Sequence, residues 1–78
     1  MCYLIRIDPI RNQRRFYLVD IGPTFLGEHC LIRIHGRIGH WQKALPPIPY
    51  PDEASTLRAA DKLLRKRLRR GYRIVWPP

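Results

Sequence analysis

The sequence predicts an α+β fold in which an antiparallel β-sheet of four to five strands packs against one long C-terminal helix. The first half of the chain consists of short segments in which apolar and polar residues alternate, as they do in strands. The second half contains one long segment with apolar residues at helical spacing. We expect a single domain over residues 1–78, because a chain of this length supports only one core.

The first three strands are expected at residues 3–7, 15–21 and 28–34. A short polar turn joins the first two, which favours an antiparallel hairpin, and residues 22–27 are expected to form a loop because Gly and Pro punctuate them. Side chains two positions apart share a face of a strand. Arg33 and His35 should therefore lie side by side, and Arg37 joins them if the chain stays extended through Gly36.

The remaining strands are expected at residues 41–45 and 72–76. Between them, the proline-rich residues 46–51 should be extended, because each proline lacks the amide that a strand ladder needs. We interpret this segment as a stiff connector. The alternative is a ligand for a proline-recognising domain.

The helix is expected to begin at Asp52, whose carboxylate can cap a backbone amide two or three residues later, and to run to Arg70 before Gly71. The arc expected to face the sheet is apolar and consists of Ala54, Leu57, Ala60, Leu64 and Leu68, with Leu63 beside it. The opposite arc is cationic and consists of Arg58, Lys62, Arg65, Lys66 and Arg69.

The chain carries 15 Lys and Arg residues against 6 Asp and Glu residues, a net charge of +9. Such a domain is drawn to polyanions, chiefly nucleic acid or an anionic membrane, although the alternative is simply a basic soluble surface. No apolar run approaches the roughly 18 residues of a membrane span, and the first residues lack a signal-peptide pattern. We therefore expect a cytoplasmic protein with no membrane partner.

Few residues of the chain suggest catalysis, metal binding or a disulfide. Cys2 and Cys30 are expected to be free thiols in a reducing compartment, although a disulfide is conceivable if their strands are neighbours. Together with His29 and His35 they match no standard zinc-ligand spacing. Ser55 is the only serine and lies outside any Gly-x-Ser-x-Gly motif. We predict a non-enzymatic protein with no catalytic residues, no metal and no cofactor.

The stretch from Ile34 to His40 is the most distinctive part of the chain. Gly36 allows a close backbone approach, and Arg37 next to it presents a planar cation that suits phosphate or carboxylate. Residues 36–39, Gly-Arg-Ile-Gly, resemble the signature of the WGR domain, named for Trp-Gly-Arg, with His35 in the place of the tryptophan. The resemblance extends along the chain to Asn12, Arg15, Phe16, Tyr17, Tyr50, Ala54, Gly71 and Tyr72.

WGR domains occur in DNA-damage-sensing poly(ADP-ribose) polymerases and as short stand-alone bacterial proteins. The resemblance implies a module that grips a DNA end or nick, with the signature Trp against a terminal sugar, while the catalytic residues of the polymerases lie in another domain. It also implies that such a module can relay contacts between protein domains. By position, Arg37 retains the role of the signature arginine and His35 takes that of the tryptophan.

We predict a nucleic-acid-binding module, with DNA favoured over RNA, that acts through phosphates and associates with the nucleoid. The alternative is a protein-interaction module that binds an acidic partner. Trp41 is either a stacking platform or a core residue, and Arg37 either contacts phosphate or bonds carbonyls of its own turn. The candidate binding residues are Asn12, Arg15, Arg33, His35, Gly36, Arg37, Trp41, Lys43, Arg58, Lys62, Arg65 and Arg69.

Overall fold

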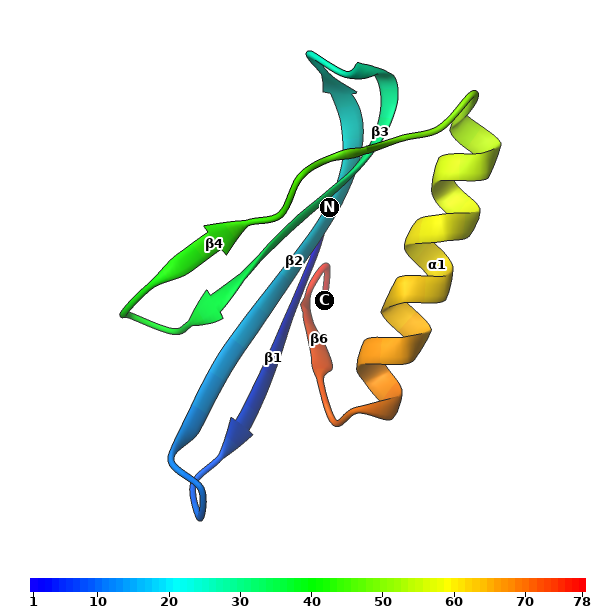
Figure 1. The fold of residues 1–78 in the computed structure, drawn as a ribbon. Helices are drawn as coiled ribbons and strands as arrows, with labels where there is room; N and C mark the ends of the chain where they lie inside the picture. The colour runs from blue at the N-terminus through cyan, green and yellow to red at the C-terminus, as the bar shows by residue number, and fades with distance from the viewer.

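A computed structural model describes residues 1–78 as one twisted antiparallel sheet with a single helix against one face (Figure 1). The elements are β1 (Cys2–Asp8), β2 (Gln13–Thr24), β3 (Gly27–Arg37), β4 (Gln42–Ala44), β5 (Ile48–Pro49), α1 (Glu53–Arg69) and β6 (Arg73–Trp76). The strand order is β4-β3-β2-β1-β6, and β5 also pairs with β3. The α+β prediction is confirmed. The sixth strand, β5, is a two-residue strand within the proline-rich connector.

The β2–β3 hairpin is longer than the sequence predicts. The loop expected at residues 22–27 is wrong, because β2 runs to Thr24 and β3 begins at Gly27, which leaves only two residues in the turn. The pairing is irregular between Gly22 and Thr24, where the ladder does not require an amide from Pro23. The Thr24 hydroxyl also accepts a hydrogen bond from the amide of Leu26 at 3.0 Å, which closes the turn.

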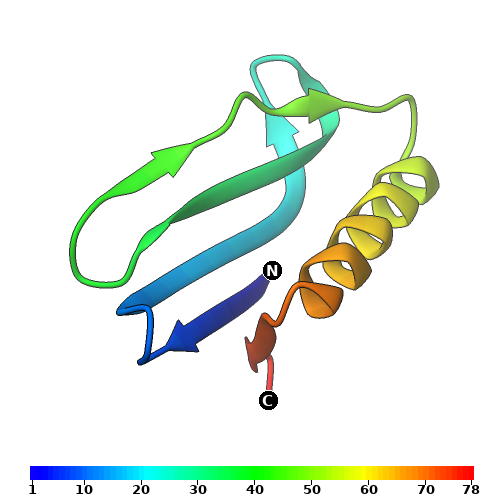
Figure 2. The same cartoon turned by 60° about the horizontal axis from the view of Figure 1, so that its bottom comes forward.

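The proline-rich connector makes more ladder bonds than expected. Within it, the Tyr50 amide donates to the His29 carbonyl of β3 at 2.8 Å, and just before it the Leu45 amide donates to the Arg33 carbonyl at 2.9 Å. The prolines need only accept, so the segment follows the edge of β3 despite them. Figure 2 shows this connector running along the edge of the sheet before the chain turns into α1.

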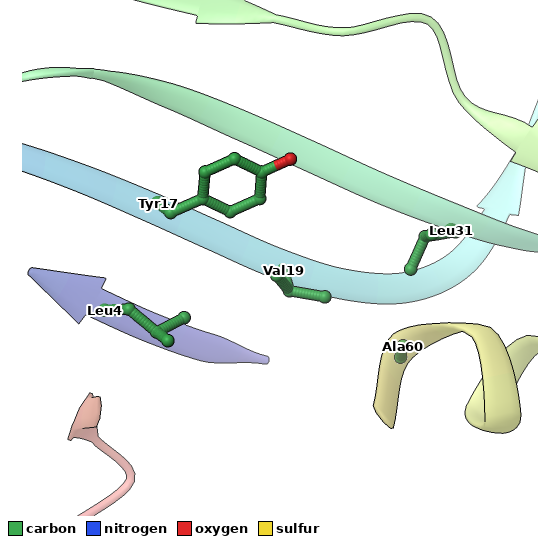
Figure 3. Close-up of a cluster of buried hydrophobic side chains, with 5 residues drawn as sticks. All are labelled: Leu4, Tyr17, Val19, Leu31 and Ala60. Atoms are coloured by element: carbon green, nitrogen blue, oxygen red, sulfur yellow. The ribbon is translucent and has the colours of Figure 1, made fainter. Parts of the chain in front are cut away.

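The core lies between the sheet and the helix. Figure 3 shows Leu4 of β1, Tyr17 and Val19 of β2, Leu31 of β3 and Ala60 of α1 gathered there. Leu4 is completely buried. These sheet residues share one face because the register pairs β1 with β2 and β2 with β3 without a shift in this region.

The helix begins as predicted, with Asp52 as its N-cap, and it ends at Arg69, one residue before the predicted end. The predicted buried arc is partly wrong. Leu57 is 49% exposed and Leu68 44% exposed, and Ala54 is exposed as well. The buried positions are Thr56 and Ala60, with Leu63 and Leu64 packed against the core. The buried face can include the polar Thr56 because its hydroxyl donates to the Asp52 carbonyl at 2.7 Å. The burial of Thr56 therefore leaves no unpaired polar group.

The face of the sheet away from the helix is also apolar. It carries half-buried side chains from three strands, which include Tyr3, Ile5, Phe16, Leu18, Ile32 and Ile34. Tyr3 and Phe16 stack with their ring centroids 5.6 Å apart. Cys2 and Cys30 are both free thiols. The helix lacks the length and apolar character that a bilayer crossing requires.

Candidate nucleic-acid interface

Three arginines form a row across the sheet. Arg6 of β1 lies opposite Arg15 of β2, and Arg15 lies opposite Arg37 of β3. All three side chains therefore point to the face that carries α1, at the end of the sheet next to the β1–β2 and β3–β4 turns. Figure 1 shows this end extending beyond the C-terminal end of α1. We call Arg6, Arg15 and Arg37 the arginine row.

No carboxylate neutralises the arginine row. The three ion pairs of the protein join the N-terminus to Asp20, Arg11 to Asp8 and Arg65 to Asp61. Like charges directly opposite each other on a sheet are destabilising. Repulsion within the arginine row therefore destabilises the isolated domain, and a bound anion would relieve this repulsion.

Arg37 is held in place by the turn next to it. Its Nη1 donates to the Asn12 carbonyl at 3.1 Å, so of the two roles left open by the sequence the carbonyl bond is present. A guanidinium has five N–H donors, so the remaining donors of Arg37 are still free to meet an anion. The bond thus fixes the direction of the side chain and leaves it able to bind.

The next row toward the helix is aromatic. Tyr17 of β2 lies opposite His35 of β3, and their rings stack with centroids 6.0 Å apart. His35 in turn meets Trp41 edge to face at 5.8 Å, and Tyr17 meets Tyr72 edge to face at 6.3 Å. Four aromatic rings from four separate parts of the chain thus lie in a continuous series. Such rings can stack on nucleobases or sugars.

Arg67 closes the aromatic series from the helix side. Its guanidinium carbon lies 4.3 Å from the centre of the Tyr17 ring, a cation–π contact. Its Nε is buried and makes no hydrogen bond. Arg67 belongs to neither of the two arcs predicted for the helix, and the structure turns it inward over the sheet. Arg67 therefore adds a fixed cation beside the arginine row.

These side chains surround a cleft of about 290 Å³. No Asp or Glu lines it. The lining residues are Arg15, Phe16, Tyr17, His35, Gly36, Trp41, Leu45, Arg67 and Tyr72. The cleft thus combines aromatic walls with two arginines, a surface suited to a group that is both planar and anionic.

The β3–β4 turn positions Trp41 at the mouth of the cleft. The Arg37 amide donates to the Trp41 carbonyl at 3.0 Å, and the Ile38 amide donates to the Arg14 carbonyl of β2 at 2.8 Å. Gly39 takes the positive φ of 76° that this turn needs. Trp41 is 55% exposed. The core role considered for Trp41 is therefore wrong, and a role in stacking stays a prediction.

The structure brings together seven of the twelve candidate residues and separates the others. Lys43 lies opposite His35 on β4, so it joins the aromatic row. The residues at or beside the cleft are Asn12, Arg15, His35, Gly36, Arg37, Trp41 and Lys43. Arg33 lies farther along β3, where its Nη2 donates to the Pro46 carbonyl at 3.0 Å.

The helix cations occupy a separate surface. Arg58, Lys62, Arg65 and Arg69 are all exposed, and none of them lines the cleft. Arg65 is paired with Asp61 at 2.9 Å, and Arg58 donates to the Ser55 hydroxyl at 3.1 Å. The cationic arc was predicted correctly as a solvent-facing arc, and its part in binding stays a prediction.

Sequence reasoning missed Arg6, Arg67 and Tyr72 as site residues. Arg6 could have been found from the hairpin register, since a turn of known length places it opposite Arg15. Arg67 follows the buried Ala60 by two helical turns. Tyr72 matches the WGR pattern, but its place beside Tyr17 could not be predicted because it depends on how the chain leaves the helix.

Comparison with known proteins settles the family. The family model described as the WGR domain matches residues 1–75. The chain belongs to the WGR family. This confirms the resemblance seen in residues 36–39, with His35 in the place of the signature tryptophan. The WGR domain is a known type of nucleic-acid-binding module and is non-catalytic in itself.

A relative shares the domain. This WGR chain is 38% identical over 71 residues to a protein of Sinorhizobium fredii (strain NBRC 101917 / NGR234) named "Uncharacterized protein y4dW". The match covers 91% of this chain and 34% of the relative, so the chain spans about a third of the relative's length. No solved structure matches the chain.

Proposed function

We propose that this WGR domain binds DNA through its phosphate backbone, with the arginine row as the principal contact. The arginine row is the main support for this proposal, because three like charges lie opposite one another on one face with no carboxylate to neutralise them. Planar guanidinium groups bind phosphate through paired hydrogen bonds. Since phosphates carry no sequence information, the binding should be largely independent of base sequence.

We further propose that a DNA end or nick is the preferred target. The arginine row lies where β2 and β3 project past the helix, and the cleft lies next to it beside the last turn of α1, so a terminal phosphate can approach the row from the open side. A duplex with a 5′-phosphorylated end should bind more tightly than the same duplex without the phosphate. Equal affinity for the two would remove the preference for ends but leave backbone binding intact. A role at DNA ends would place the protein in the bacterial cytoplasm, at the nucleoid.

The test compares two variants that lose equal charge. In one, Arg6, Arg15 and Arg37 are replaced by Gln; in the other, Arg58, Lys62 and Arg69 are replaced by Gln. Affinity for a short duplex is measured at several salt concentrations. Each phosphate neutralised contributes about −0.9 to the slope of log affinity against log salt. The first variant should flatten this slope by up to about 2.7, and the second should change it less.

Either of two results would contradict the proposal. One is that the wild-type domain does not bind duplex DNA even at low salt. The other is that both variants flatten the salt dependence of the affinity equally, which would indicate diffuse attraction by net charge. A polyglutamate chain serves as the competitor for the protein-partner alternative. If polyglutamate binds as tightly as duplex DNA at equal charge, an acidic protein becomes the better candidate.

A further inference from the structure

Trp41 is an exposed aromatic residue that the fold holds in a fixed position. Its side chain is 55% exposed, yet its backbone carbonyl accepts the amide of Arg37 and its ring meets His35 edge to face at 5.8 Å. A perpendicular contact with one neighbour leaves at least one face of the indole open. An open ring that is already ordered loses little conformational freedom when a flat ligand stacks on it.

The cleft beside Trp41 is small. Its volume of about 290 Å³ lies at the lower limit of roughly 300–1,000 Å³ for sites that enclose a small ligand. A single planar group with its phosphate is the size of ligand that it suits, and a paired duplex cannot enter it. A base inside a duplex is stacked on both faces. The terminal base of a blunt end has an open outer face but is still joined to its partner, so an unpaired base is the one that can enter the cleft beside Trp41.

The cations at the cleft are placed for the phosphate of such a nucleotide. Arg15 lines the cleft and has no ion-pair partner. Arg67 also lines it, fixed over the Tyr17 ring, and its Nε lacks a hydrogen-bond partner. Aromatic rings and cations around one cleft are the two elements of a site for single-stranded nucleic acid.

We propose that the cleft binds one unpaired nucleotide, with its base stacked on Trp41 and its phosphate held by Arg15 and Arg67. The inference rests on the proposed function and adds the class of nucleotide that this site takes. The unpaired nucleotide can come from the interior of a single strand or from the overhang of a duplex, since both present a free base with its phosphate.

The test follows the fluorescence of Trp41 in the Trp76→Phe variant, in which Trp41 is the only tryptophan. The probes are a short single strand, a blunt duplex of the same length, and that duplex with a short overhang. The single strand and the overhang duplex should quench the emission, because a stacked base lies on the ring. The blunt duplex should bind with little quenching. A closed circular single strand shows where the bound nucleotide comes from. If the circle quenches the emission, the site takes nucleotides from the interior of a strand. If it does not, the site takes nucleotides at strand ends.

Substitution gives an independent readout. Trp41→Ala should weaken single-strand binding by about 5- to 150-fold, the loss of one base–aromatic stack, and Trp41→Phe should retain most of the affinity. The matched control is Trp76→Ala, because Trp76 is 53% exposed but lies opposite Tyr3, away from the cleft. This control should leave binding unchanged.

The failure of this inference is distinct from the failure of the proposed function. If the arginine-row variant still weakens duplex binding but Trp41 is neither quenched by a saturating single strand nor needed for binding, the stacking site is overturned and the DNA-binding proposal stands. If neither duplex nor single strand binds at low salt, both are overturned.

Discussion

Gly36 shows at the scale of one residue why the signature contains glycine. A Cβ at this position would lie 2.1 Å from the Trp41 carbonyl oxygen, 2.8 Å from the Gln42 Cα and 3.0 Å from the Phe16 ring. The sequence predicted a close backbone approach at Gly36, and this is confirmed. The strand does not bend there, however, and the positive φ belongs to Gly39. Two glycines three positions apart, one in β3 and one in the turn after it, thus serve different purposes, which the sequence alone does not separate.

Gly36→Ala should destabilise the domain by about 1–3 kcal/mol or more, because backbone atoms must move to admit the methyl group. The matched control is Gly22→Ala, since a Cβ at Gly22 meets nothing within 4 Å. That control should be neutral, or should stabilise the domain by up to about 1 kcal/mol because alanine reduces the conformational entropy of the unfolded chain. Urea denaturation measures both. Equal effects would show that the crowding at Gly36 relaxes at no cost.

At the scale of elements, the sequence predicted five of the six strands, the helix and its N-cap, but it missed β5 within the proline-rich connector. It predicted the buried face of the helix only in part, because Ala60 and Leu64 pack in the core whereas Leu57 and Leu68 are exposed. The prediction assumed that polar residues face solvent, whereas Thr56 satisfies its hydroxyl inside the helix and Arg67 rests on an aromatic ring. Both arrangements depend on tertiary contacts, so periodicity could not reveal them.

The helix start offers a test of pH dependence. The Asp52 carboxylate accepts the Ser55 amide at 2.7 Å, and this hydrogen bond, aided by the Ser55 hydroxyl and the charge of Arg58, lowers the pKa of Asp52. A lowered pKa stabilises the fold above the ordinary carboxyl pKa of about 3.9, and the stabilisation is lost as pH falls through the lower folded-state pKa.

Asp52→Asn should retain the cap, because Asn is as good an N-cap as Asp, but without a titrating charge. The free energy of unfolding of the wild type should therefore fall more steeply than that of Asp52→Asn as pH drops below about 4. Thermal unfolding from pH 7 to pH 2 compares the two. Parallel curves would show that Asp52 does not contribute to the acid dependence.

At the scale of the whole molecule, the site depends on a register between strands that are distant in sequence. Arg6 and Arg37 are separated by 31 positions, yet Arg15 brings them into one row. The sequence identified Arg15 and Arg37 as candidates from the likeness to WGR domains, but it could not show that they are neighbours. The grouping of charge on one end of the sheet, and the separation of the helix cations from it, appear only in the assembled fold.

The two faces of the sheet should differ in their effect on stability, and β1 carries adjacent residues that test this. Leu4 is completely buried under the helix, while Ile5 lies on the uncovered face and is half-buried. Leu4→Ala should cost about 2–5 kcal/mol, a large share of the roughly 4–12 kcal/mol expected for a chain of this length. Ile5→Ala should cost less than about 2 kcal/mol, since solvent already reaches its side chain. Urea denaturation at two protein concentrations measures both. Equal costs would mean that the uncovered face is buried in solution, and a midpoint that rises with protein concentration would identify a second copy of the chain as the cover.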